Sequence, residues 1–314
     1  MREPLISICI PAYKQVQFLR RLLNSIAGQS FKDFEVVVSD DSSGNEVEEL
    51  CSEFKDLFKL IYKRNENALG TPENWNEAIR MAKGNWIKLM HNDDWFVNEE
   101  VLKQFYSAAV KYPESEFFFS AFQNVEQENG EKQVVKCSWF DLLFLRISPL
   151  HLFRKVYVGN PSCTLIRRGV NLFYDNKFKF VVDFEYYIRC FNKNKRWRYI
   201  DEVLLNIGFH SEQVTKYTFL VAEVQIPENH QLIRQMGTRI LFNVFVYDYY
   251  WRMYRNLKIR SIMEVKKYDA QKMHNILEQM INFQKNIPPS FLKTGLISKS
   301  CMVISYLASL LRKH

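Results

Sequence analysis

Two adjacent carboxylates, Asp93 and Asp94, directly follow the strand-like stretch 85–90 and have the clearest capacity for chemistry in this sequence. Carboxylate oxygens are the ligands that Mg²⁺ and Mn²⁺ prefer, and these ions commonly share them with substrate phosphates. A metal bound there would neutralise the negative charge that develops on a departing diphosphate. The alternative is a plain turn or helix cap, because Asp is common at both.

Polar or turn-forming residues also follow three earlier strand-like stretches of the chain. The stretches are 5–11, 34–39 and 60–63, and the residues at their ends are Pro11 to Tyr13, 40–44, and Asn65, Asn67 and Gly70. Taken alone, the run 40–44 is also typical of an Asx turn, in which a carboxylate bonds to the nearby backbone. Ligands of open parallel sheets bind where the strands end. Four such ends in register therefore predict one ligand-binding rim.

The pattern between these stretches indicates the elements that must position the rim. Apolar residues recur with helical spacing in 17–29 and between Pro72 and Gly84, and another helix is expected after Asn98. Apolar strands alternate with these helices. The alternation predicts an α/β fold with an open, mostly parallel sheet flanked by helices. The sequence contains neither GxGxxG nor GxxxxGK[ST], which argues against dinucleotide and P-loop sites.

In their order and spacing, these motifs resemble family 2 glycosyltransferases of GT-A fold. The matching segments are Ser7 to Tyr13 (SICIPAY), Val36 to Ser43 (VVVSDDSS), Asn67 with Gly70, Asn76 to Gly84, and His91 to Asp94 (HNDD). The resemblance extends over residues 4–215 and implies a Rossmann-like sheet with a nucleotide-sugar at its rim. It implies that the following residues contact this donor: Pro11, Tyr13, Asp40, Asn67, Asn76, His91 and Asn92.

The resemblance also implies a metal site. Asp93 lies where the family's DxD motif binds a divalent cation, so Mn²⁺ or Mg²⁺ is the expected cofactor. His91 stands in place of the first Asp of that motif, and imidazole can either ligate Mn²⁺ or bond a ribose hydroxyl. His210 is expected to reach the metal or the diphosphate, with a purely structural role as the alternative.

Asp183 corresponds to the family's catalytic base, which removes the proton from the acceptor hydroxyl. Val182 stands where the family carries Glu, and an apolar neighbour can raise the pKa of a carboxyl group towards the range that suits a base. The alternative is that Asp183 caps the helix that starts here. Glu185 is the second candidate for the base.

The resemblance implies an inverting glycosyltransferase that moves one sugar from a nucleotide-sugar, most simply UDP-linked, to a hydroxyl of a glycan or lipid-linked acceptor. Bacterial cell-surface polysaccharide synthesis is the expected setting. Single transfer is expected because Lys193 replaces the Gln of the Gln-x-x-Arg-Trp motif of processive synthases before Arg196-Trp197. Two other hypotheses stay open. One is a sugar nucleotidyltransferase, which should carry a Gly-rich loop after the first strand, and the other is a non-catalytic, nucleotide-sugar-binding or scaffold member of an assembly complex.

Composition places the chain among globular proteins of a reducing compartment. Hydrophobic residues make up 47% and charged residues 25% of its 314 residues, which is unlike a disordered chain. The six cysteines are scattered and form no CxxC pair. The first residues lack a signal-peptide pattern, and no uncharged apolar stretch reaches the roughly 18–20 residues that span a bilayer. A cytoplasmic enzyme is therefore expected.

The excess of basic residues lies in the last part of the chain. The net charge is +8, and residues 251–314 contain 12 Lys or Arg against three Asp or Glu. We expect a catalytic domain over 1–215 and a helical, basic extension over 216–314. Within it, 295–313 fits an amphipathic helix at an anionic membrane surface, so a peripheral position on the inner face of the plasma membrane is predicted, with no nucleic-acid partner. Packing on the catalytic domain or in a homodimer is the alternative.

Overall fold

The computed structural model describes residues 3–170, 173–210 and 220–311. The chain forms two compact units, of which the first comprises Met1–Arg146 with Tyr157–Ser211, and the second Ile147–Val156 with Glu212–His314. The predicted boundary between residues 215 and 216 falls in the segment 211–219 and lies outside the described residues.

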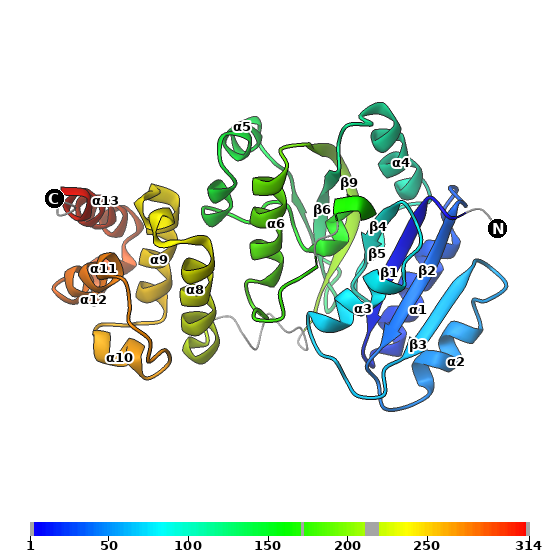
Figure 1. Ribbon diagram of the computed structural model, residues 1–314, viewed down its shortest axis with the longest axis horizontal. Coiled ribbons are helices and arrows are strands. Elements are labelled where there is room, and N and C mark those ends of the chain that lie inside the picture. Colours follow the sequence, from blue (N-terminus) through cyan, green and yellow to red (C-terminus); the bar gives the residue numbers. More distant parts are fainter. Residues whose placement is uncertain (1–2, 171–172, 211–219, 312–314) are drawn as a thin grey trace. The chain divides into compact units, whose positions relative to one another are not determined.

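One half of the sheet in the first unit is entirely parallel, as the sequence predicts. β1 pairs with β2 and β4, and β2 pairs with β3, all in parallel (Figure 1). These strands are β1 (Ile6–Ala12), β2 (Phe34–Asp40), β3 (Leu60–Arg64) and β4 (Trp86–Leu89). Because their carboxyl ends meet at one edge, the turns after them form a common rim.

The other half of the sheet mixes strand directions. The full order is β3-β2-β1-β4-β8-β6-β9-β5, with β7 paired to β6. β8 runs antiparallel to both β4 and β6, whereas β9 runs parallel to β6. The strands of this half are β5 (Trp95–Phe96), β6 (Phe117–Glu126), β7 (Lys132–Val135), β8 (Thr164–Arg167) and β9 (Trp197–Phe209). Sequence periodicity did not reveal β5, β7 or β8, because strands of two to four residues are too short to show a period.

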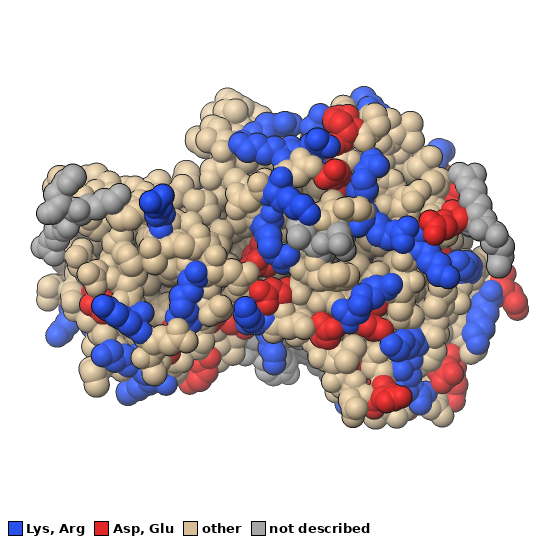
Figure 2. Space-filling model, viewed as in Figure 1, with Lys and Arg blue, Asp and Glu red and all other residues tan. Residues whose placement is uncertain are grey.

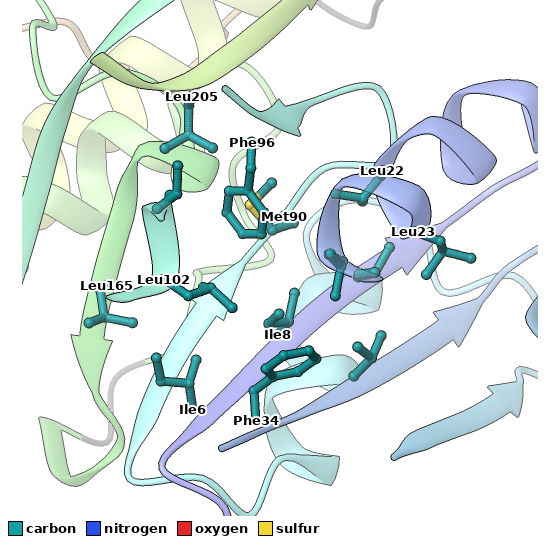
Figure 3. Packing of buried hydrophobic residues seen from close by; sticks show 14 of the residues in the cluster. Ile6, Ile8, Leu22, Leu23, Phe34, Met90, Phe96, Leu102, Leu165 and Leu205 are labelled. Carbon is teal, nitrogen blue, oxygen red and sulfur yellow. The ribbon is translucent and has the colours of Figure 1, made fainter. Parts of the chain in front are cut away.

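Helices flank this sheet. In the first unit they are α1 (Val16–Ala27), α2 (Glu46–Ser52), α3 (Glu73–Met81), α4 (Val101–Lys111), α5 (Trp139–Ile147) and α6 (Val182–Lys193). Ile6 and Ile8 of β1 pack with Leu22 and Leu23 of α1 and with Leu102 of α4 in the core shown in Figure 3. Burying one such side chain stabilises the fold by about 1.5–3 kcal/mol. On the face of the first unit in Figure 2, acidic and basic side chains are interspersed.

Two short 3-10 turns flank β8, and the one before it supports the rim. They are η2 (Pro161–Cys163), before β8, and η3 (Arg168–Val170), after it. In η2, Ser162 is fully buried and faces the residues that follow β4. A connection that sequence analysis left without a role is therefore part of the site.

The second unit is helical, which confirms the predicted C-terminal extension. It contains η1 (Pro149–Phe153), α8 (Ala222–Met236), η4 (Thr238–Phe242), α9 (Val244–Asn256), α10 (Ile262–Lys266), α11 (Asn275–Lys285), α12 (Pro289–Lys293) and α13 (Gly295–Leu311). Its core is aromatic, with Tyr247, Tyr250, Trp251 and Tyr254 of α9 all buried. Among the described residues, no helix has the length and apolarity needed to cross a bilayer.

Candidate functional site

The loop after β4 brings together the residues predicted to bind a metal. One ligand atom from each of His91, Asp93 and Asp94 lies within 4.8 Å of the others. His210, at the end of β9, places its Nε2 3.1 Å from Oδ2 of Asp93. Residues separated by more than 100 positions in the sequence therefore meet at the predicted rim, and the fold explains how: β9 pairs with β5, which follows the loop.

Asp94 stabilises this loop from its buried side. Its side chain is buried, and its two oxygens accept hydrogen bonds from Nδ2 of Asn160 at 2.7 Å and from the backbone N–H of Gly208 at 3.2 Å. Burial, together with the negative charge of Asp93, raises the pKa of Asp94 to about 8. Without a cation, the pair therefore holds a proton that it would not hold in water.

Among the residues that the structure describes, one ring nitrogen of His91 has no hydrogen-bond partner. Its backbone N–H donates to Oγ of Ser162 at 2.9 Å, and its ring lies 4.7 Å from that of Trp75, whereas Nε2 is buried without a hydrogen bond. Burial lowers the pKa of His91, so the imidazole is neutral and can act as a ligand. The Nδ1 atom of His91 lies 4.0 Å from Oδ2 of Asp94, and a neutral imidazole beside two carboxylates fits a divalent cation. A nitrogen ligand favours Mn²⁺ over Mg²⁺.

Three further side chains hold the loop, and sequence analysis assigned a role to none of them. Arg21 of α1 donates to the backbone oxygen of Asp93 at 2.7 Å and stacks on the Trp95 ring at 3.6 Å. Ser162 accepts from the backbone of His91 and, through its carbonyl oxygen, from the buried Lys88 ammonium. Burial lowers the pKa of Lys88 to about 7. The sequence contained one signal for this role, which is the lysine inside the apolar stretch of β4. A cation rarely occupies a buried strand unless it has a partner there.

A cleft of about 330 Å³ opens where β1 and β2 end. Its lining comes from the turn after β1 and from the loop that leads into α2, and consists of Lys14, Gln15, Val16, Ser42, Ser43, Gly44, Glu46 and Val47. Pro11 and Tyr13 belong to the β1 end, and Tyr13 is 53% exposed. Asn67 is exposed in the loop after β3. These three predicted contacts therefore lie at the rim and are accessible.

The two aspartates at the end of β2 have different surroundings. Asp40 is fully buried, and its oxygens accept bonds from the backbone of Ser42 at 2.8 Å and from the Tyr62 hydroxyl at 2.8 Å, which is the Asx turn. Asp41 is 9% exposed and accepts from the backbone N–H groups of Leu69 and Gly70. Asp41, which sequence analysis did not select, is thus the more accessible carboxylate.

Asn76 and Asn92, which are both predicted to contact the donor, also differ in how deeply they are buried. The Asn76 amide is buried, accepts from the backbone N–H of Tyr174 at 2.9 Å and donates to its carbonyl at 2.9 Å. A ligand contact from Asn76 would compete with these bonds, which fix the segment before α6. Asn92 is only partly buried, and its amide donates to Oε1 of Gln15 at 3.5 Å, between the ends of β4 and β1.

Asp183 lies in the first turn of α6, whose N-cap is Val181. Because α6 leads into β9, which runs parallel to β6, the start of α6 points to the rim where the parallel strands end. Burial raises the pKa of Asp183 to about 6, and its Oδ1 accepts from the backbone N–H of Phe184 at 2.8 Å. Glu185 instead binds Arg189 through both oxygens, at 2.8 and 2.9 Å. The geometry therefore favours Asp183 as the base.

A chain of aromatic contacts connects the metal-binding loop to the helix of Asp183. From His91, ring centroids follow at 4.7 Å to Trp75, at 5.1 Å from Trp75 to Tyr174, and at 4.1 Å from Tyr174 to Tyr186 of α6. Offset and edge-to-face aromatic pairs each contribute about 0.5–1.5 kcal/mol beyond their burial. The stack thus fixes α6 relative to the loop.

Known proteins share this sequence pattern and fold. The sequence model described as glycosyl transferase family 2 matches residues 7–173, more than half of the chain. An uncharacterized glycosyltransferase, MJ1057 of Methanocaldococcus jannaschii, is 23% identical over 260 residues, 80% of this chain and 81% of that relative. The β-1,3-glucosyltransferase WfaP of Escherichia coli is 28% identical over 120 residues, 38% of this chain and 45% of WfaP. Its name gives UDP-Glc as donor and α-D-GlcNAc-diphosphoundecaprenol as acceptor.

A solved structure extends the likeness to almost the whole chain. The crystal structure of Staphylococcus aureus TarS 1–349 in complex with UDP-GlcNAc matches with a TM-score of 0.62 and 16% identity. The match covers 96% of this chain and 89% of the TarS chain. At this identity the likeness concerns the fold, and it confirms the predicted GT-A architecture.

The close approach of β9 to the Asp93–Asp94 loop gives the first prediction. A Cβ on Gly208 would lie 2.5 Å from the backbone oxygen of Asp93. We expect Gly208→Ala to displace the loop, to lower the free energy of unfolding by about 1–3 kcal/mol, and to weaken metal binding. Thermal denaturation with and without Mn²⁺ measures both effects. Gly169→Ala is the control, because no atom of the described residues lies within 4 Å of its added Cβ. Equal behaviour of the two variants would refute the packing argument.

Proposed function

The chain belongs to glycosyl transferase family 2 and is a glycosyltransferase, and we propose that it inverts the anomeric centre as it transfers one sugar from a UDP-linked donor to a hydroxyl group. The acceptor is a glycan or a lipid-linked sugar of bacterial cell-surface polysaccharide synthesis. The observation that carries the mechanism is a carboxyl of raised pKa, Asp183, whose helix is fixed by aromatic contacts to a cation-binding loop.

The donor lies along the rim. Its nucleoside occupies the cleft at the ends of β1 and β2, where Tyr13 and Asn67 are accessible. Asp93, His91 and His210 would hold a divalent cation at this rim. When bound, the cation neutralises charge on the leaving diphosphate. Asp94 stays beneath as the support of the loop. The UDP-GlcNAc complex of TarS and the UDP-Glc donor of WfaP support uracil as the nucleobase of the donor.

Asp183 acts on the acceptor. Its carboxylate takes the proton from the acceptor hydroxyl while that oxygen attacks the anomeric carbon from the face opposite the diphosphate. The new carbon–oxygen bond forms as the bond from the anomeric carbon to the diphosphate oxygen breaks, and the electron pair leaves with the diphosphate. A group with a pKa of about 6 is ionised at neutral pH and still accepts a proton effectively.

The setting follows from weaker observations. The diphosphoundecaprenol acceptor of WfaP supports a lipid-linked acceptor on the cytoplasmic side of a bacterial membrane. All six cysteines are free, which suits a reducing compartment.

Donor identity is tested by offering the full-length protein a panel of nucleotide-sugars with Mn²⁺ or Mg²⁺. We expect UDP-sugars to raise the melting temperature and to release UDP when plausible acceptors are present. Absence of stabilisation by any donor would refute the transferase mechanism. Stabilisation without turnover would favour a nucleotide-sugar-binding protein of an assembly complex.

The proposed metal site predicts that a substitution of Asp93 abolishes the stabilisation of the protein by Mn²⁺. Asp93→Asn removes a carboxylate ligand, so Mn²⁺ should no longer stabilise the UDP-bound protein, whereas at 100 times its dissociation constant it stabilises the wild type by about 2.7 kcal/mol. Differential scanning fluorimetry with UDP, with and without Mn²⁺, measures this effect. Asp201→Asn is the matched control, because that side chain is 69% exposed on β9. An unchanged Mn²⁺ effect in Asp93→Asn would place the cation elsewhere.

The raised pKa of Asp183 predicts an acidic limit to activity. The base must be ionised, so kcat/KM should fall as the pH drops through about 6, to about a tenth of its plateau one pH unit lower. Asp183→Asn should lower turnover at least about a hundredfold and keep the UDP-dependent rise in melting temperature. Steady-state kinetics from pH 5 to 8 measures the profile, again with Asp201→Asn as control. Loss of UDP binding in Asp183→Asn would instead assign this residue to the donor site.

A further inference from the structure

Helix α13 of the second unit presents its polar and apolar residues in the reverse of the usual order. Its buried positions are Ser298, Met302, Ser305 and Ser309, three of them serines. Apart from Lys299 and Ser300, its outward positions are mainly aliphatic, and the exposed fractions are 82% for Leu296, 39% for Ile297, 40% for Val303, 57% for Ile304, 52% for Leu307 and 80% for Leu311. A helix that packs on a soluble core normally turns its apolar stripe inward.

Buried hydrogen bonds fix this orientation. The Tyr247 hydroxyl lies 2.7 Å from Oγ of Ser305, and the Trp251 indole N–H donates to Oγ of Ser298 at 3.1 Å. Tyr306 donates its hydroxyl to the backbone oxygen of Phe242 at 2.6 Å. Buried Tyr and Trp polar atoms need partners, and an unsatisfied one costs about 1–3 kcal/mol. Turning the helix to bury its leucines would leave the aromatic residues of α9 without those partners.

The outward aliphatic residues therefore form a lasting surface rather than a packing defect. Contiguous exposed apolar surface of this kind marks a site of contact with a membrane or another protein. α12, next along the chain, adds Phe291 at 52% exposure.

The charge of the same region indicates which kind of partner binds this apolar surface. Residues 251–314 contain 12 Lys or Arg against three Asp or Glu, and Lys293, the last residue of α12, is exposed. A second copy of the chain would place two basic surfaces against each other around a shared axis, which costs energy. An anionic bilayer offers both apolar depth and complementary charge. At about 1.5 Å per residue, the 17 residues of α13 are roughly 26 Å long, and lying flat in the interface suits a helix that does not span.

We propose that the outward face of α13, formed by Leu296, Val303, Ile304, Leu307 and Leu311, inserts into the interface of an anionic lipid bilayer. The serine face remains docked on α9. Basic side chains of the second unit contact the lipid headgroups, and the aliphatic side chains contact the upper part of the acyl chains. This inference is independent of the donor and acceptor proposed above.

The test uses the full-length protein and vesicles that contain no glycolipid. Binding is measured by sedimentation with phosphatidylcholine vesicles, with or without phosphatidylglycerol. We expect the wild type to sediment with the anionic vesicles, and less so at high salt. The double variant Ile304→Ser with Leu307→Ser should bind at least about tenfold more weakly, because each side chain loses apolar burial in the lipid. Its melting temperature should not fall, because both residues are exposed.

A matched control removes equally exposed apolar side chains from another helix. Trp139 and Phe140 of α5 are 65% and 51% exposed, and Trp139→Ser with Phe140→Ser should bind vesicles as the wild type does. Loss of binding in this control instead, or unchanged binding of the α13 variant, would overturn the assignment. So would equal binding to neutral and anionic vesicles. A wild-type dimer that binds no vesicles and that the α13 substitutions convert to a monomer would show that a second copy covers the face.

Discussion

Two neighbouring carboxylates can share a poorly hydrated pocket only if their charges are compensated, and this constraint shapes the site. Asp94 meets it through Asn160, the backbone N–H of Gly208, and a pKa raised to about 8. Asp93 meets it through His210, while Arg21 neutralises part of the local charge and holds the loop. A divalent cation would complete the compensation, because it replaces a shared proton with two positive charges.

The same loop is also connected to the helix that carries Asp183, the proposed base. His91 has exchanged a carboxylate for an imidazole, which lowers the negative charge of the site and allows its ring to pack against Trp75. Through Tyr174 and Tyr186, that contact continues to α6. One substitution in the DxD motif is therefore compatible both with cation binding and with a packed connection to the catalytic helix.

In the second unit, apolar residues rather than charged ones are found in an unfavourable environment. In the first unit, charged groups are buried at the rim, which costs free energy of desolvation. In the second unit, α13 leaves apolar groups exposed, which also costs free energy. It does so because its serines bind the polar atoms of buried tyrosine and tryptophan side chains. In both cases a few hydrogen bonds to buried polar atoms outweigh the usual placement of polar and apolar residues. These departures coincide with the two surfaces for which ligands are proposed.

Local pattern in the sequence determined the α/β class, the parallel half of the sheet, the rim and the family, because strand and helix periods and the residues at strand ends depend only on near neighbours. It also placed Asp93 and Asp183 in the positions that their motifs imply. Tertiary structure decided matters that depend on burial and distant partners. Asp40 and Asp41 look alike in the sequence, but only Asp40 is fully enclosed. Asp183 and Glu185 differ in their hydrogen-bond partners, because Arg189 binds Glu185. The face that α13 turns outward was fixed by aromatic residues some 50 positions earlier, a separation that no local pattern reports.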